Sequence, residues 1–106
     1  MSEVVVAGSD PDGLAPALEK RGADVTHAAD TANRPALEEA GIVDADVLVV
    51  TDAGLATSVP IAVDLNPDLR VVIYTRDSMP EFVKGQAGHI VDPELLDPET
   101  VAEEIV

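Results

Sequence analysis

The sequence contains no cysteine, and its only aromatic residues are Tyr74 and Phe82. Without cysteine the chain has no disulfide framework, no thiolate nucleophile and no cysteine metal site. With so few aromatic side chains, the core must be built from Val, Ile, Leu and Ala, which suits a parallel sheet that is buried on both faces. The chain also lacks an apolar run of membrane-spanning length and a basic N-terminal segment followed by an apolar one. We therefore expect a cytoplasmic protein without membrane insertion.

Basic residues are scarce, because 6 Lys and Arg face 21 Asp and Glu, which gives a formal net charge of −15. A chain without a basic patch cannot release counterions from a phosphate backbone, so we expect no nucleic-acid partner. One interpretation of the charge is a partner of opposite sign. The other, which we favour, is a solvated acidic surface suited to a halophilic, high-salt cytoplasm, where screening removes most of the self-repulsion.

Apolar runs and helical patterns alternate along the 106 residues, a length that predicts a single domain over residues 1–106. The runs predict strands over 3–8, 24–29, 45–51, 69–74 and 88–91. The helical patterns predict helices over 12–21, 35–40, 55–65, 79–86 and 98–106. This alternation predicts a three-layer α/β fold, Rossmann-like or flavodoxin-like, with a parallel five-stranded sheet in the order 2-1-3-4-5.

Residues with short oxygen-bearing side chains mark the expected helix starts. The predicted N-caps are Asp10 or Asp12, Asn33, Ser78 and Asp97. Proline in a first turn costs a helix no hydrogen bond, so Pro60 places the regular part of the third helix from Thr57 or Ser58 onward.

In a sheet of this order, ligands bind at the carboxyl ends of the strands, where the order reverses between the first and third strands. The turn from Gly8 to Gly13 joins the first strand to a helix at that place, and such a turn points helix N–H groups at a phosphate. The residues predicted to bind a cofactor in this crevice are Gly8, Ser9, Asp10, Gly13, Asp30, Thr51 and Asp52. Gly54 and either Thr75 or Arg76 are expected beside them.

Two segments carry a family resemblance. The run Leu37–Ile42 followed by Asp44–Thr51 resembles the TrkA-N (RCK) Rossmann domain, and residues 65–72 and 85–92 continue the likeness. That resemblance implies a regulatory module that binds NAD(H) or an adenine nucleotide. The chain is also similar to small stand-alone haloarchaeal proteins sometimes labelled CTP synthetase. It has, however, neither a P-loop lysine motif nor an amidotransferase cysteine for such an activity.

The phosphate turn departs from the pattern of the resembled family, which is G-x-G-x-x-G. Gly8 and Gly13 hold the first and third glycine places, but Asp10 stands in the second. A carboxylate there occupies the space that the pyrophosphate needs and repels it, so the nucleotide site is predicted to be degenerate. Asp30 is the candidate for the ribose-binding acid, with a turn-forming role as the alternative.

A response-regulator receiver shares the strand order 2-1-3-4-5 and supplies the alternative interpretation. Receivers carry an acid pair after the first strand, a phospho-accepting Asp after the third, and Thr or Ser after the fourth. Asp10, Asp52 and Thr75 fill these places loosely. Receivers also carry a Lys before Pro after the fifth strand, where this chain has Asp92. The alternative is therefore a degenerate receiver-like domain with Asp52 as a vestigial phospho-acceptor.

No arrangement of residues indicates catalysis. His27 and His89 lie in or beside predicted strands, without a serine nucleophile at motif spacing. Paired acids such as Glu38 and Glu39 fall on predicted helix surfaces. We therefore predict a non-catalytic binding or regulatory module without a metal site. Its expected partner is a second copy or another protein, which it contacts through exposed helices.

Overall fold

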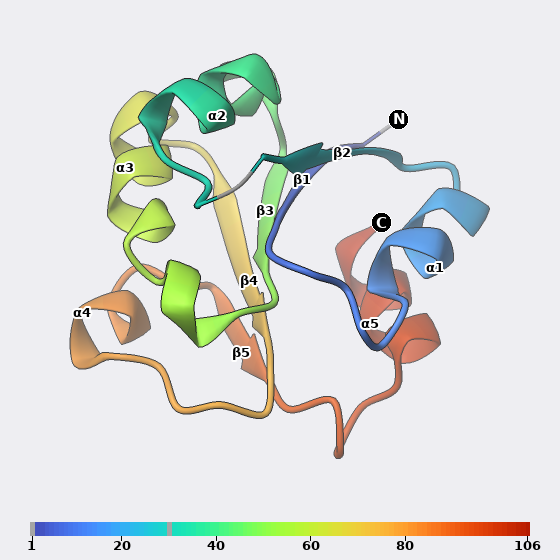
Figure 1. The fold of residues 1–106 in the computed structure, drawn as a ribbon. Coiled ribbons are helices and arrows are strands. Elements are labelled where there is room, and N and C mark those ends of the chain that lie inside the picture. The colour runs from blue at the N-terminus through green and yellow to red at the C-terminus, as the bar shows by residue number, and fades with distance from the viewer. Residues whose placement is uncertain (1, 30) are drawn as a thin grey trace.

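A computed structural model describes residues 2–29 and 31–106 of the chain. Within these residues, five strands alternate with five α-helices and two short 3₁₀ helices, η1 and η2 (Figure 1). The strands are β1 (Glu3–Ala7), β2 (Asp24–Ala28), β3 (Val47–Val50), β4 (Arg70–Tyr74) and β5 (His89–Val91). The helices are α1 (Leu14–Lys20), α2 (Arg34–Glu39), η1 (Ile42–Asp44), η2 (Ala53–Leu55), α3 (Ser58–Leu65), α4 (Glu81–Lys84) and α5 (Pro98–Ile105).

The strands form one parallel sheet in the order β2-β1-β3-β4-β5, as predicted. This is a flavodoxin-like α/β fold. The two central strands β1 and β3 pair in the register Val4–Val47 to Ala7–Val50. Both are runs of β-branched and small apolar residues that suit burial on two faces. The reversal of strand order therefore falls between β1 and β3, where the sequence places it.

Helices cover both faces of the sheet, and each face has its own apolar core (Figure 1). Helices α2, α3 and α4 pack on the face that carries Val5, Leu48 and Ile73. Helices α1 and α5 pack on the opposite face, which carries Val4, Val49 and Val72. Neighbouring residues of a strand point to opposite faces, so continuous apolar runs are needed to fill both cores.

The predicted N-caps Asn33 and Asp97 are confirmed. The Asn33 side chain accepts a hydrogen bond from the Ala36 amide at 3.1 Å, and Asp97 caps α5 in the same manner. Helix α3 begins at Ser58, as Pro60 requires. The predicted Ser78 cap and the helix over 79–86 are wrong, because Pro80 is extended (φ −59°, ψ 151°) and α4 spans only Glu81–Lys84.

Within the part of the chain that the structure describes, no helix is both long enough and apolar enough to cross a membrane.

Candidate functional site

The carboxylate of Asp10 caps helix α1. Its two oxygens accept hydrogen bonds from the backbone amides of Leu14 at 3.0 Å and Ala15 at 2.8 Å. Gly13, directly before Leu14, occupies the N-cap position in a left-handed conformation (φ 76°) and has no side chain that could cap the helix. Neither acid predicted as the N-cap is the N-cap residue, which is Gly13, but the Asp10 side chain satisfies the first two amides of the helix. The amides at the start of α1 already have an anionic partner, so the turn does not present them to a phosphate.

Gly8 is required by a close approach between β1 and β3. Its φ is +109°, and a Cβ atom there would lie 2.7 Å from the Thr51 hydroxyl oxygen. That hydroxyl belongs to a buried side chain, and it donates to the backbone carbonyl of Ser9, with the Ala7 carbonyl at 3.4 Å as the alternative acceptor. The glycine thus lets the turn after β1 pass against the end of β3, which accounts for its presence without any ligand.

A polar cavity of about 300 Å³ opens at the carboxyl end of the sheet. Its lining residues come from the loops after β1, β3 and β4, and they are Ser9, Pro11, Asp12, Thr51, Asp52, Thr75, Arg76 and Asp77. The structure thus brings together Ser9, Thr51 and Asp52 of the predicted site, with Thr75 and Arg76 beside them. Gly8, Asp10 and Gly13 are not in the lining. The predicted ribose-binding acid, Asp30, lies outside the described residues.

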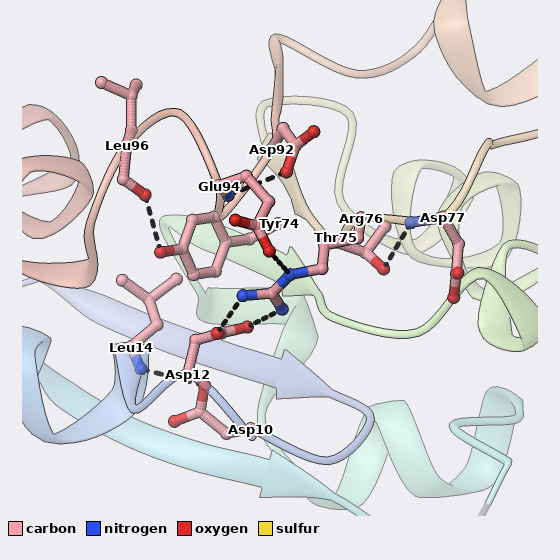
Figure 2. A network of polar contacts seen from close by, with 10 residues as sticks. All are labelled: Asp10, Asp12, Leu14, Tyr74, Thr75, Arg76, Asp77, Asp92, Glu94 and Leu96. Carbon is pink, nitrogen blue, oxygen red and sulfur yellow. Dashed lines mark hydrogen bonds and ion pairs between the residues drawn. The ribbon is translucent and has the colours of Figure 1, made fainter.

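Arg76 is the basic residue of this cavity, and it joins three loops (Figure 2). Its two terminal nitrogens donate to the two carboxylate oxygens of Asp12 at 3.1 and 3.0 Å. Its Nε donates to Glu94 at 2.7 Å. These hydrogen bonds raise the pKa of the guanidinium further above its usual range, with the bonds to Asp12 as the largest cause. We call Asp12, Arg76 and Glu94 the arginine clamp.

Asp52 and Thr75 enter the cavity from the ends of β3 and β4. One oxygen of the exposed Asp52 carboxylate accepts a hydrogen bond from the Gly54 amide at 2.8 Å. The Thr75 hydroxyl accepts from the Asp77 amide at 3.2 Å. Each side chain therefore shapes its own loop, while the other Asp52 oxygen has no hydrogen-bond donor among the described residues.

Tyr74 contacts the loop between β5 and α5 through its hydroxyl group, which points at Leu96 (Figure 2). It is buried in the core on the α5 face, and its hydroxyl donates to the Leu96 carbonyl at 2.9 Å. Burial is the largest cause that raises the pKa of this phenol. Tyr74 thereby holds the β5–α5 loop where Glu94 reaches Arg76.

Asp92 occupies the place after β5 where a receiver carries lysine. Its carboxylate accepts a hydrogen bond from the Glu94 amide at 2.8 Å (Figure 2). This contact stabilises a turn at the start of the loop between β5 and α5. Among residues 2–29 and 31–106, no group of three or more His, Asp or Glu side chains is placed to hold a metal ion.

Residues 4–105 match a protein family described as a family of unknown function, DUF7126. The chain belongs to this family. No curated protein matches the sequence.

Several solved structures share the fold. A CheY-like receiver domain protein from Methanospirillum hungatei is 17% identical, with a TM-score of 0.73, and the match covers 99% of this chain and 90% of that one. A response regulator from Burkholderia pseudomallei, solved with a phosphorylated aspartic acid, a calcium ion and citrate, is 23% identical (TM-score 0.69; 100% and 67% covered). A protein assigned to pilus assembly in Burkholderia thailandensis is 17% identical (TM-score 0.67; 98% and 94% covered).

These comparisons correct the resemblance to the TrkA-N domain, which is wrong. The similar structures are receiver-type domains and pilus-assembly proteins, and the family match is to DUF7126. The interpretation as a degenerate nucleotide-binding module is wrong with it, and it also fails physically. Asp10 fills the start of α1 and Gly8 serves a contact with Thr51, so neither residue forms a pyrophosphate cradle. The fold shared with these solved structures is the one that the receiver-like alternative expects.

The arginine clamp is the feature that sequence reasoning missed. Arg76 is predicted near the crevice, but its partners are separated from it by 64 residues (Asp12) and 18 residues (Glu94). A single Arg after a buried strand, in a chain with so few bases, is the one signal that pointed to such a role.

Proposed function

We propose that this chain is a degenerate receiver-type regulatory module that acts by binding rather than by catalysis. The observation that carries the proposal is the meeting of Asp52 and Thr75 in one polar cavity, at the ends of β3 and β4. Receivers place a phospho-accepting Asp and a hydroxyl residue at these two strand ends. The shared fold of the solved response regulators supports the same assignment.

The remaining parts of a phosphorylation site are replaced. The two residues directly after β1 are Gly8 and Ser9 instead of an acid pair, and Asp10 is used as a helix cap. Asp92 stands where the receiver lysine would neutralise the phosphoryl group. A phosphoryl group on Asp52 would add negative charge to a cavity that already contains Asp12 and Asp77. Among the described residues that line it, the one cation is Arg76, which is already paired with acids. We therefore regard Asp52 as a vestigial acceptor.

Arg76 gives this site a permanent internal ion pair instead of a transient phosphoryl contact. Because it is held by both Asp12 and Glu94, the loops after β1, β4 and β5 are tied together without any modification. The module would then present one fixed surface to its partner. We also infer a cytoplasmic location, with which the absence of cysteine is consistent.

The test is phosphorylation by acetyl phosphate with Mg²⁺ in molar KCl, followed by intact-mass measurement. In this reaction a carboxylate oxygen of Asp52 would attack phosphorus, and acetate would leave. We expect no phosphoryl adduct on the wild-type chain, while a receiver domain with the complete acid pair and lysine is labelled in the same buffer. An adduct that disappears in Asp52→Asn would overturn the proposal.

A restoration experiment tests whether the site is of receiver type at all. The double variant Ser9→Asp/Asp92→Lys returns an acid after β1 and a cation after β5. We expect it to gain an adduct at Asp52 under the same conditions, and the further variant Asp52→Asn to lose it. A folded double variant that gains no adduct would count against a receiver-type site.

A further inference from the structure

The sheet edge at β5 has apolar side chains on both of its faces, beside the exposed His89. β5 is the last strand of the sheet and pairs only with β4, so its outer side has no partner strand among the described residues. Ile90 pairs with Ile73 and therefore faces the same side as α4, on which Phe82 lies. Ile90 is 50% exposed and Phe82 46%. The other edge strand, β2, exposes mainly polar residues such as Thr26 and His27.

On the opposite face, an apolar groove of about 240 Å³ lies between β5 and α5. Its apolar lining is Val72, Val91, Leu96, Val101 and Ile105, and its polar lining is Arg70, His89, Thr100 and Glu104. The groove exists because α5 packs mainly against α1 and leaves the sheet beside β5 uncovered (Figure 1). A strand added to β5 would point alternate side chains to the Ile90 face and into this groove.

The charge of the chain indicates what kind of strand fits. Lys20, Arg21, Arg34, Arg76 and Lys84 each form an ion pair with an acid. The sixth base, Arg70, donates to the Glu104 carbonyl. With 21 acids in the chain, the surface therefore attracts cations and repels a second copy that also carries −15.

We propose that the β5 edge binds an extended, basic segment of a partner protein as an added sixth strand. Main-chain hydrogen bonds to β5 would supply affinity, and consecutive apolar residues would contact Ile90 on one face and the groove on the other. Lys or Arg residues flanking them would meet the acidic surroundings. This deepens the proposed function by naming the partner's chemistry. It rests on that proposal only in taking the module to act by binding another protein.

The test is an NMR titration of the full-length, ¹⁵N-labelled chain with three synthetic seven-residue peptides. Each peptide has three central residues with two flanking residues on either side, so that apolar side chains reach both faces of the added strand. One has Val flanked by Lys (Lys/Val), one has Ser flanked by Lys, and one has Val flanked by Glu (Glu/Val). The salt concentration is the lowest at which the chain stays folded. We expect the Lys/Val peptide to shift the amides of 89–91 and their neighbours in α4 and α5. The other two peptides are expected to bind at least about tenfold more weakly, since each lacks one of the two contributions.

Two variants locate the binding surface, with a third as a matched control. Ile90→Asn removes the exposed side chain of β5, and Leu96→Asn changes the groove on the other face. Each is expected to weaken the affinity for the Lys/Val peptide about tenfold, which corresponds to the burial of one branched apolar side chain. Val43→Asn, at a similarly exposed valine in η1, is expected to leave binding unchanged.

Three results would overturn the inference. Shifts spread over the whole acidic surface would show unspecific cation binding. Equal binding of the Glu/Val peptide would show that charge has no part in recognition. Concentration-dependent dimerisation through β5 without any peptide would assign the edge to a second copy. None of these results alters the phosphorylation assay at Asp52, so the two proposals fail separately.

Discussion

Arg76 and Asp12 are 64 residues apart in the chain, and their side chains form a bidentate salt bridge. Its two nitrogen–oxygen distances are 3.1 and 3.0 Å. A planar guanidinium matches a carboxylate in this geometry, which a lysine does not reproduce. The Asp12 side chain is only 21% exposed, so solvent competes less at this pair than at an open surface pair. The same Arg76 contacts Glu94, so one side chain sets the relative positions of three loops.

Arg76→Gln is therefore expected to loosen the loops after β1 and β5 while the sheet stays intact. Hydrogen–deuterium exchange should become severalfold faster in peptides covering residues 8–13 and 92–97. Arg34→Gln is the matched control, because Arg34 forms a looser surface pair with Asp64 at 3.7 Å. Unchanged exchange in both loops would show that the clamp has no structural role.

Asp10→Ala is expected to destabilise the fold by about 1 kcal/mol, the usual cost of losing an N-cap side chain. The reason is that two amides at the start of α1 lose the carboxylate oxygens that they now contact. Asp10→Asn keeps one acceptor and should cost less. Asp68→Ala, at an exposed acid, is the control. Urea unfolding of the three variants measures the difference, and an unchanged midpoint for Asp10→Ala would contradict the capping role.

Gly8→Ala is expected to cost more, about 1–3 kcal/mol, because it combines a positive φ with a steric conflict. The new Cβ would lie 2.7 Å from the Thr51 hydroxyl oxygen and 3.1 Å from Asp52 Cβ. Gly85→Ala is the matched control, since Gly85 has φ −78° and no atom near the added methyl group. A Gly8→Ala chain as stable as wild type would show that the turn has another conformation.

The fold was predictable because its signals are local and mutually consistent. Val4–Val6 and Val47–Val50 are continuous apolar runs that only a doubly covered parallel sheet accommodates. Asn33 and Asp97 contact amides three residues away, so sequence spacing alone identifies them as caps. Ser78 failed because Pro80, extended in the structure, delays the helix, and this competing preference lies outside the cap itself.

The site was predictable only in part. Strand order places Ser9, Thr51 and Asp52 at one end of the sheet, and the cavity contains all three. The clamp depends on how three loops fold toward one another, which no local pattern records. The TrkA-N resemblance failed for a related reason. The resemblance rested on a glycine that ends a helix and on the buried strand Val47–Val50 that follows it. Any doubly wound domain needs these features, so they do not identify one family.

Asp97, the N-cap of α5, is expected to make the stability of the fold depend on pH. Hydrogen bonds from Thr100 hold the pKa of the Asp97 carboxyl below its usual range. A carboxyl with a lower pKa in the folded state stabilises the fold above its unfolded pKa, near 4, and loses this contribution as the pH falls through the folded value. Asp97→Asn keeps an oxygen for the Thr100 amide but cannot titrate. Above about pH 4 the wild type is thus expected to have a higher free energy of unfolding than Asp97→Asn. This difference is expected to shrink as the pH falls below that value. Urea unfolding of both chains from pH 7 to 3 measures this difference. A difference that stays constant across the range would show that the charge of Asp97 does not support the cap.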